Sequence, residues 1–155
     1  MSKTKLTATD SFSETFTRTT ARDYKFVVVT RADQKNVEAA RRLLDGYNAR
    51  LDEIGVEGVE RAQEFESKCY ELRRAALDAK DYKLAQKFCR KADEYSADAL
   101  LLGRIERTEK RLIEAQEDAD AKKVIGRTWT SRMDLAMKQS SKMSQRGTVE
   151  IVPIG

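Results

Sequence analysis

The stretch Ala76-Leu77-Asp78-Ala79-Lys80-Asp81-Tyr82-Lys83-Leu84-Ala85 decides the fold, because a long helical pattern reverses direction here. Lys80-Asp81-Tyr82 forms the sharpest turn signal between two segments whose apolar residues recur every three or four positions. The residues of this heptad seam are Val37, Ala40, Leu44, Tyr47, Leu51, Ile54, Ala62, Phe65, Cys69, Leu72, Ala76 and Ala79 before the turn, and Ala85, Phe88, Ala92, Tyr95, Ala99 and Leu102 after it.

The segment on either side of the turn can fold in two ways. In the first, residues 34–79 and 82–121 form one antiparallel helical hairpin with its tip at Asp81, reaching ~60 Å at a rise of about 1.5 Å per residue. Gly58 and Gly103 lie at nearly equal separations from that tip and would share one kink. In the second, turns near 55–58, 80–82 and 103 produce a four-helix bundle. The lack of other turn formers around Gly103 favours the hairpin.

Strand patterns lie outside the helical segment on both sides. Tyr24–Thr30 is β-branched and aromatic with a central run of three valines. The C-terminal part predicts a strand over Val124–Thr130, a helix over Arg132–Arg146 that opens on a Ser131/Asp134 capping box, and a strand over Thr148–Val152.

These strands are expected to pair, because two strands and one short helix are marginal alone. A central position suits the valine run, which is apolar on both faces. The expected fold class is α+β, mostly α: a small three-stranded sheet with one helix, carrying the long hairpin as an insertion. We therefore expect an extended polar tail over 1–22, anchored by Phe12 and Phe16, a basic α/β platform over 23–31 plus 122–155, and a helical arm over 32–121.

Charge is segregated along the chain. The net charge of +4 divides into +3 for residues 1–31, −4 for 32–121 and +5 for 122–155. A platform built from both basic ends is a suitable footprint for an anionic partner. Trp129 could stack on such a partner or pack on the sheet against the C-terminal helix. The candidate binding residues are Lys122, Lys123, Arg127, Trp129, Arg132, Lys138, Lys142 and Arg146.

Composition argues against catalysis. The chain has no histidine, the commonest general base and metal ligand, and its two cysteines cannot form a four-ligand zinc site alone. No glycine-rich phosphate loop is present. We therefore expect no enzyme activity, no metal and no cofactor. No apolar run approaches membrane-spanning length and no secretory signal is evident, which predicts a cytoplasmic protein with reduced cysteines.

The segment Trp129-Thr130-Ser131-Arg132-Met133-Asp134-Leu135-Ala136-Met137-Lys138, with Val149-Glu150-Ile151-Val152 at the end, resembles small uncharacterised bacteriophage and actinobacterial proteins. Those proteins combine a W-x-x-R-x-x-L-A-x-K helix entry with a VEIV-like final strand, and Tyr24–Val29 is similar to their first strand. The resemblance covers the two ends of the chain. It implies a mobile-element accessory protein in a host-cell cytoplasm and assigns no activity.

A function in binding follows from the arm. A two-helix hairpin of this length buries too little to stand alone in water, so its seam should pack on a second copy or a partner protein. The leading hypothesis is a phage-type protein that inhibits or redirects a host or defence macromolecule. DNA or RNA binding by the platform and a virion or scaffold role are the alternatives. The seam residues assigned to this contact are Leu44, Leu51, Phe65, Leu72, Phe88, Tyr95 and Leu102.

Overall fold

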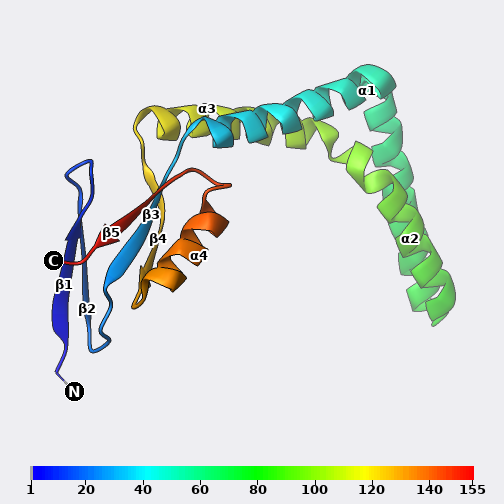
Figure 1. Cartoon of the computed structure of the whole chain (residues 1–155). Coiled ribbons are helices and arrows are strands. Elements are labelled where there is room, and N and C mark those ends of the chain that lie inside the picture. The colour runs from blue at the N-terminus through cyan, green and yellow to red at the C-terminus, as the bar shows by residue number, and fades with distance from the viewer. Residues whose placement is uncertain (1) are drawn as a thin grey trace. The chain divides into compact units, whose positions relative to one another are not determined.

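The protein has an α+β fold, described here for residues 2–155 of a computed structural model (Figure 1). The chain forms two compact units, one of residues 2–39 and 112–155, the other of residues 40–111. We call the first the sheet unit and the second the hairpin unit.

A three-stranded antiparallel sheet lies at the centre of the sheet unit, in the order β4-β3-β5. Its strands are β3 (Phe26–Arg31), β4 (Val124–Thr130) and β5 (Thr148–Pro153). The valines at 27, 28 and 29 are at most 1 % exposed, so the expected central position of this strand is confirmed. The register pairs Val27 with Trp129 on one side and with Val152 on the other, which places all three side chains on one face.

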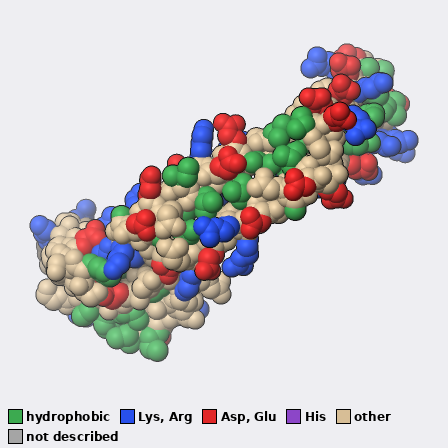
Figure 2. Space-filling model, turned by 90° about the horizontal axis from the view of Figure 1, so that it is seen from above, with side chains coloured by type: hydrophobic (Ala, Val, Ile, Leu, Met, Phe, Trp, Pro, Cys, Tyr) green, Lys and Arg blue, Asp and Glu red, His purple; other side chains and the backbone are tan. Residues whose placement is uncertain are grey.

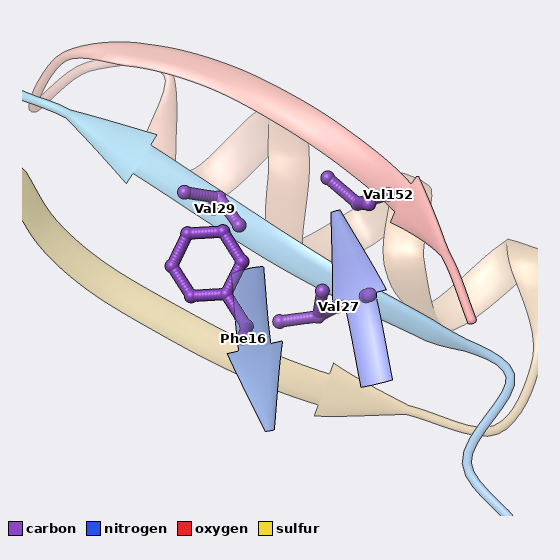
Figure 3. Close-up of a cluster of buried hydrophobic side chains, with 5 residues drawn as sticks. Phe16, Val27, Val29 and Val152 are labelled. Atoms are coloured by element: carbon purple, nitrogen blue, oxygen red, sulfur yellow. The ribbon is translucent and has the colours of Figure 1, made fainter. Parts of the chain in front are cut away.

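The expectation of an extended tail over residues 1–22 was wrong for the part that the structure describes, which excludes Met1. Residues in this segment form an antiparallel β-hairpin of β1 (Thr4–Thr9) and β2 (Thr15–Thr20). Phe16 from β2 is 2 % exposed and lies over Val27 and Val29 (Figure 3). The alternation of polar threonines with Ala8 and Phe16 creates one apolar face, which is a strand signal that the threonine-rich composition obscured. Phe16 is an anchor as expected, whereas Phe12 remains 49 % exposed.

Helix α4 (Met133–Met143) packs against all three strands of the sheet. Ala136 is fully buried, and the sulfur of Met143 lies 3.6 Å from the hydroxyl of Thr30. The expected capping box is absent, because Arg132 is the N-cap and its side chain makes no capping hydrogen bond. Trp129 does not pack under this helix: it joins the valine cluster on the opposite face, beneath the β1–β2 hairpin.

The helical segment folds as an antiparallel hairpin, and the four-helix bundle is not formed. Its helices are α1 (Gln34–Asp78), α2 (Tyr82–Ala99) and α3 (Leu101–Asp120). At the tip, the Asp81 carboxylate accepts a hydrogen bond of 3.2 Å from the backbone nitrogen of Leu84, which caps α2. Lys80 supplies the left-handed residue of the turn with φ of 59°.

Both legs of the hairpin are interrupted, though not at the glycines expected. Helix α1 kinks at Gly55, whose φ of 68° and ψ of 171° belong to a region that favours glycine. The opposite leg breaks at Leu100, between α2 and α3. Gly58 instead allows close packing, since a Cβ there would lie 2.8 Å from Cβ of Ile54. Gly103 lies inside α3 with open space around it.

The interior of the hairpin unit is built from small side chains. Its most buried residues are Ala40, Val59, Ala62, Ala76, Ala85, Ala92, Ala99, Leu101 and Thr108. Side-chain hydrogen bonds cross between the legs at three places. The Arg50 guanidinium donates two to the Asp98 carboxylate, the Gln63 amide donates one to the carbonyl oxygen of Ala99, and the Ser96 hydroxyl donates one to the Glu66 carboxylate. An interior of alanines leaves no room for the larger apolar side chains, which therefore lie at its margin.

Candidate docking groove on the helical hairpin

An apolar groove of about 390 Å³ lies between α1 and α2 in the hairpin unit. Five apolar side chains and three lysines line it. They are Phe65, Lys68, Cys69 and Leu72 from α1, and Lys87, Phe88, Lys91 and Tyr95 from α2. Both cysteines of the chain are free, and Cys69, which lines this groove, is half-buried.

The groove follows from the heptad pattern together with the alanine interior. Ala62, Ala76, Ala85, Ala92 and Ala99 occupy the inward positions and are at most 7 % exposed. The larger seam residues fall beside these positions, so Phe65 is 50 % exposed and Leu72 is 42 % exposed. The Phe65 and Tyr95 rings stack with centroids 5.3 Å apart and form one end of the groove. Exposed aromatic and aliphatic side chains that adjoin one another are a typical feature of docking surfaces.

Four of the seven predicted seam residues come together at this groove, namely Phe65, Leu72, Phe88 and Tyr95. The other three do not line it: Leu44 and Leu51 are half-buried, and Leu102 is 40 % exposed. The interruptions at Gly55 and Leu100 separate these three residues from the four, because a kink changes which side of a helix faces its neighbour.

The three lysines of the groove were missed in the sequence. Lys68 immediately precedes Cys69, and Lys87 immediately precedes Phe88. A basic residue next to an apolar seam position was therefore the sequence feature that could have predicted them. Within the described residues, none of the three lysines lies within the 4.0 Å of a carboxylate oxygen that would make an ion pair. Their charges are therefore available to a partner.

The flank of α1 next to the groove is acidic. Glu60, Glu64 and Glu71 line a shallow depression there, and Lys68 lies at the boundary between this flank and the groove. Figure 2 shows the same mixture on one face of the molecule, with basic and acidic side chains interspersed among exposed hydrophobic ones. The groove thus differs from its surroundings in carrying one sign of charge.

A second cluster of charged groups lies in the sheet unit around Arg31, which is 8 % exposed. Its guanidinium donates hydrogen bonds to Asp10 at 2.5 Å, to Glu14 at 2.6 Å and to the carbonyl oxygen of Lys122 at 2.7 Å. The ring of Phe12 covers it at 4.5 Å. The bonds to Asp10 and Glu14 join the β1–β2 hairpin to β3.

The Asp10 carboxyl is held ionised by this cluster. Burial by itself would raise its pKa, but hydrogen bonds from Arg31 and from the backbone of Glu14 and Phe12 outweigh burial and lower the pKa below the usual 3.8. The pKa of Arg31 is raised in turn, since its bonds to Asp10 and Glu14 outweigh its own desolvation. A neighbouring pocket of about 280 Å³ is lined in part by Phe12, Arg31 and Lys122. Because two carboxylates already pair with the Arg31 guanidinium, this cluster is a structural tie and not an open anion site.

The predicted anion-binding residues are divided between the two faces of the sheet. Arg127 and Trp129 lie on the face covered by the β1–β2 hairpin, where Arg127 stacks over Phe16 at 5.7 Å and Trp129 adjoins Tyr24. Lys138 and Lys142 belong to α4, which covers the opposite face. Trp129 is half-buried against the core cluster, so it packs on the sheet as one alternative predicted, but on the face opposite the C-terminal helix.

The remaining residues of that set are engaged locally or isolated. Lys122 lies over the Phe12 ring at 5.0 Å, Lys123 pairs with Asp118 at 3.9 Å, and Arg132 pairs with Asp134 at 3.2 Å. Arg146 is exposed beyond the end of α4. The basic residues of the predicted anion-binding set are exposed, but they do not form one continuous patch.

Comparisons with known proteins give no match: no protein-family model, no curated protein and no solved structure corresponds to this chain. In the part that the structure describes, every helix is too short or too polar to cross a membrane.

Proposed function

We propose that this chain is a non-enzymatic binding protein that docks another protein in the groove of its helical hairpin. Four adjoining side chains carry the proposal: Phe65 and Leu72, which are exposed, and Phe88 and Tyr95, which are partly buried. Leaving this apolar area in water is unfavourable by about 25 cal/mol for each Å². A partner that covers it gains that free energy, and aromatic side chains at the centre of a contact usually dominate its affinity.

Inhibition or redirection of a host macromolecule stays a prediction from the sequence, as do a phage origin and a virion or scaffold role. Docking is common to all three. The groove favours the helical arm over the basic platform as the surface that makes the contact.

The test is site-specific photocrosslinking in the cell of origin. A photoreactive amino acid replaces Leu72 in the groove, and the matched control replaces Tyr82, which is 68 % exposed at the start of α2 and lies outside the groove. We expect a discrete protein adduct at position 72 that is lost when Phe65→Ser is added, and none at position 82. Equal labelling at both positions, or no adduct at either, would contradict docking in the groove.

Direct binding of nucleic acid by the sheet unit is the weaker alternative, because its basic residues lie on two faces of the sheet. Fluorescence anisotropy with a 30-base-pair duplex and a single strand, at low and moderate salt, separates the two. We expect no micromolar binding at moderate salt. Tight binding that collapses as salt is added and is abolished by Arg127→Glu would move the functional contact to the sheet unit.

A further inference from the structure

We infer that the groove takes an acidic amphipathic helix, an inference that rests on the proposed docking at this groove. Its two ends are the Phe65–Tyr95 pair and the pair of Leu72 and Phe88. Each pair is separated from the other by seven residues on both helices, which is two turns or ~10.5 Å. A partner helix presents apolar side chains at positions i, i+3 or i+4, and i+7 over the same distance.

The lysines define the charge of that partner helix. Lys68 is three residues beyond Phe65 on α1, and Lys91 is four residues before Tyr95 on α2, so both lie midway along the groove. Lys87 lies nearer the Leu72 and Phe88 end. An apolar helix flanked by Glu or Asp would satisfy three ammonium groups that have no described carboxylate within 4.0 Å. A basic helix would be repelled by the same groups.

The same placement disfavours a second copy of this chain as the occupant. A two-fold axis through the middle of the groove brings each residue near that axis close to the same residues of the other copy. Lys68 and Lys91 are the charged residues at this level, so self-pairing would gather four ammonium groups around an apolar contact. Like charges in such a position are unfavourable, whereas an acidic partner neutralises them.

The experiment uses the full chain and three fluorescein-labelled peptides of 18 residues. All three share one apolar stripe at i, i+3, i+7 and i+10, and the flanking positions are all Glu, all Gln or all Lys. Fluorescence anisotropy measures each affinity at two salt concentrations. We expect the Glu peptide to bind most tightly and the Lys peptide most weakly, with the difference narrowing as salt is added, because these charges are exposed.

Charge reversal in the groove tests the assignment to particular residues. K68E combined with K91E should weaken binding of the Glu peptide about tenfold and strengthen binding of the Lys peptide. The matched control, K83E combined with K110E, makes the same change in net charge at two lysines that do not line the groove. It should leave the order of the three peptides unchanged.

Three results would overturn the inference. The first is equal binding of all three peptides, the second is Glu-peptide binding that survives Leu72→Ser, and the third is a dimer in sedimentation velocity that Leu72→Ser dissociates. If the three peptides bind equally but the photocrosslinked adduct at position 72 still forms, only the acidic character of the partner helix would be wrong. If no photocrosslinked adduct forms at position 72, the proposed docking in the groove would be wrong as well.

Discussion

Phe65 of α1 and Tyr95 of α2 stack across the helical hairpin, with ring centroids 5.3 Å apart and planes inclined by 28°. Phe65 nevertheless remains 50 % exposed. The pair therefore joins the two legs and at the same time presents an apolar surface to solvent. The contribution of this pair to stability and its contribution to the proposed docking can be separated by mutation.

Phe65→Ser should lower the free energy of unfolding by about 1–2 kcal/mol, because half the ring is already in water and the lost stacking is modest. Chemical denaturation followed by circular dichroism at 222 nm measures this. Leu72→Ser, at 42 % exposure, should behave similarly. Both variants should stay folded at room temperature, so that a loss of docking reports on the groove. A loss of helix content in the native baseline would contradict this.

Ala92→Leu should destabilise the hairpin unit by about 1–3 kcal/mol, since Ala92 is fully buried and extra methyl groups would push the helices apart. Ala75→Leu is the control, because Ala75 is an exposed residue of α1. Thermal unfolding of the two variants should differ clearly. Equal stability would mean that the legs are not closely packed at Ala92.

Gly55→Ala should destabilise by about 1–2 kcal/mol, because alanine rarely adopts the backbone conformation of the kink. Gly46→Ala, a glycine in α1 with open space around it, should stabilise by about 0.5–1 kcal/mol. Denaturant titrations of the pair provide the comparison. Should Gly55→Ala be the more stable protein, α1 would be straight at this position in solution.

Asp10→Asn should lower stability at neutral pH by about 2 kcal/mol, because Arg31 loses a charged hydrogen-bond partner. The native pKa of Asp10 is lowered, so the stability it contributes is present above pH 3.8 and is lost as the pH falls below that value. Denaturation between pH 2.5 and 7 should therefore show wild type and variant converging in acid. Asp23→Asn, at a carboxylate that is 80 % exposed, should follow the wild-type curve. Parallel curves for Asp10→Asn and wild type would refute the linkage.

Gly147→Ala should strongly destabilise the sheet unit, because a Cβ at this position would collide with the backbone carbonyl oxygen of Arg31. Gly126→Ala meets only the flexible end of Met143 and should cost less. Comparison of their melting temperatures distinguishes backbone contact from side-chain contact. If the two variants melt together, the close approach of Gly147 to β3 is absent in solution.

Local patterns were sufficient for most of the architecture. The valine run at 27–29, the turn at Lys80-Asp81-Tyr82 and the three-and-four spacing of apolar residues correctly predicted the central strand, the hairpin tip and the two helical legs. Each of these features depends only on residues that are close in the chain, so the apolar spacing or the turn residues predict it from the sequence alone. The β1–β2 hairpin was missed because the threonine-rich composition obscured the alternation of polar residues with Ala8 and Phe16.

The sequence by itself therefore determined the α+β class and the insertion of a helical hairpin between β3 and β4. Only the tertiary structure decided which seam residues stay outside, because exposure depends on how the alanines at 62, 92 and 99 pack between the legs. It likewise separated Arg127 from Lys138, since residues close in sequence can lie on opposite faces of a sheet. The lysine-lined groove arises from two helices together, and no single stretch of the chain contains it.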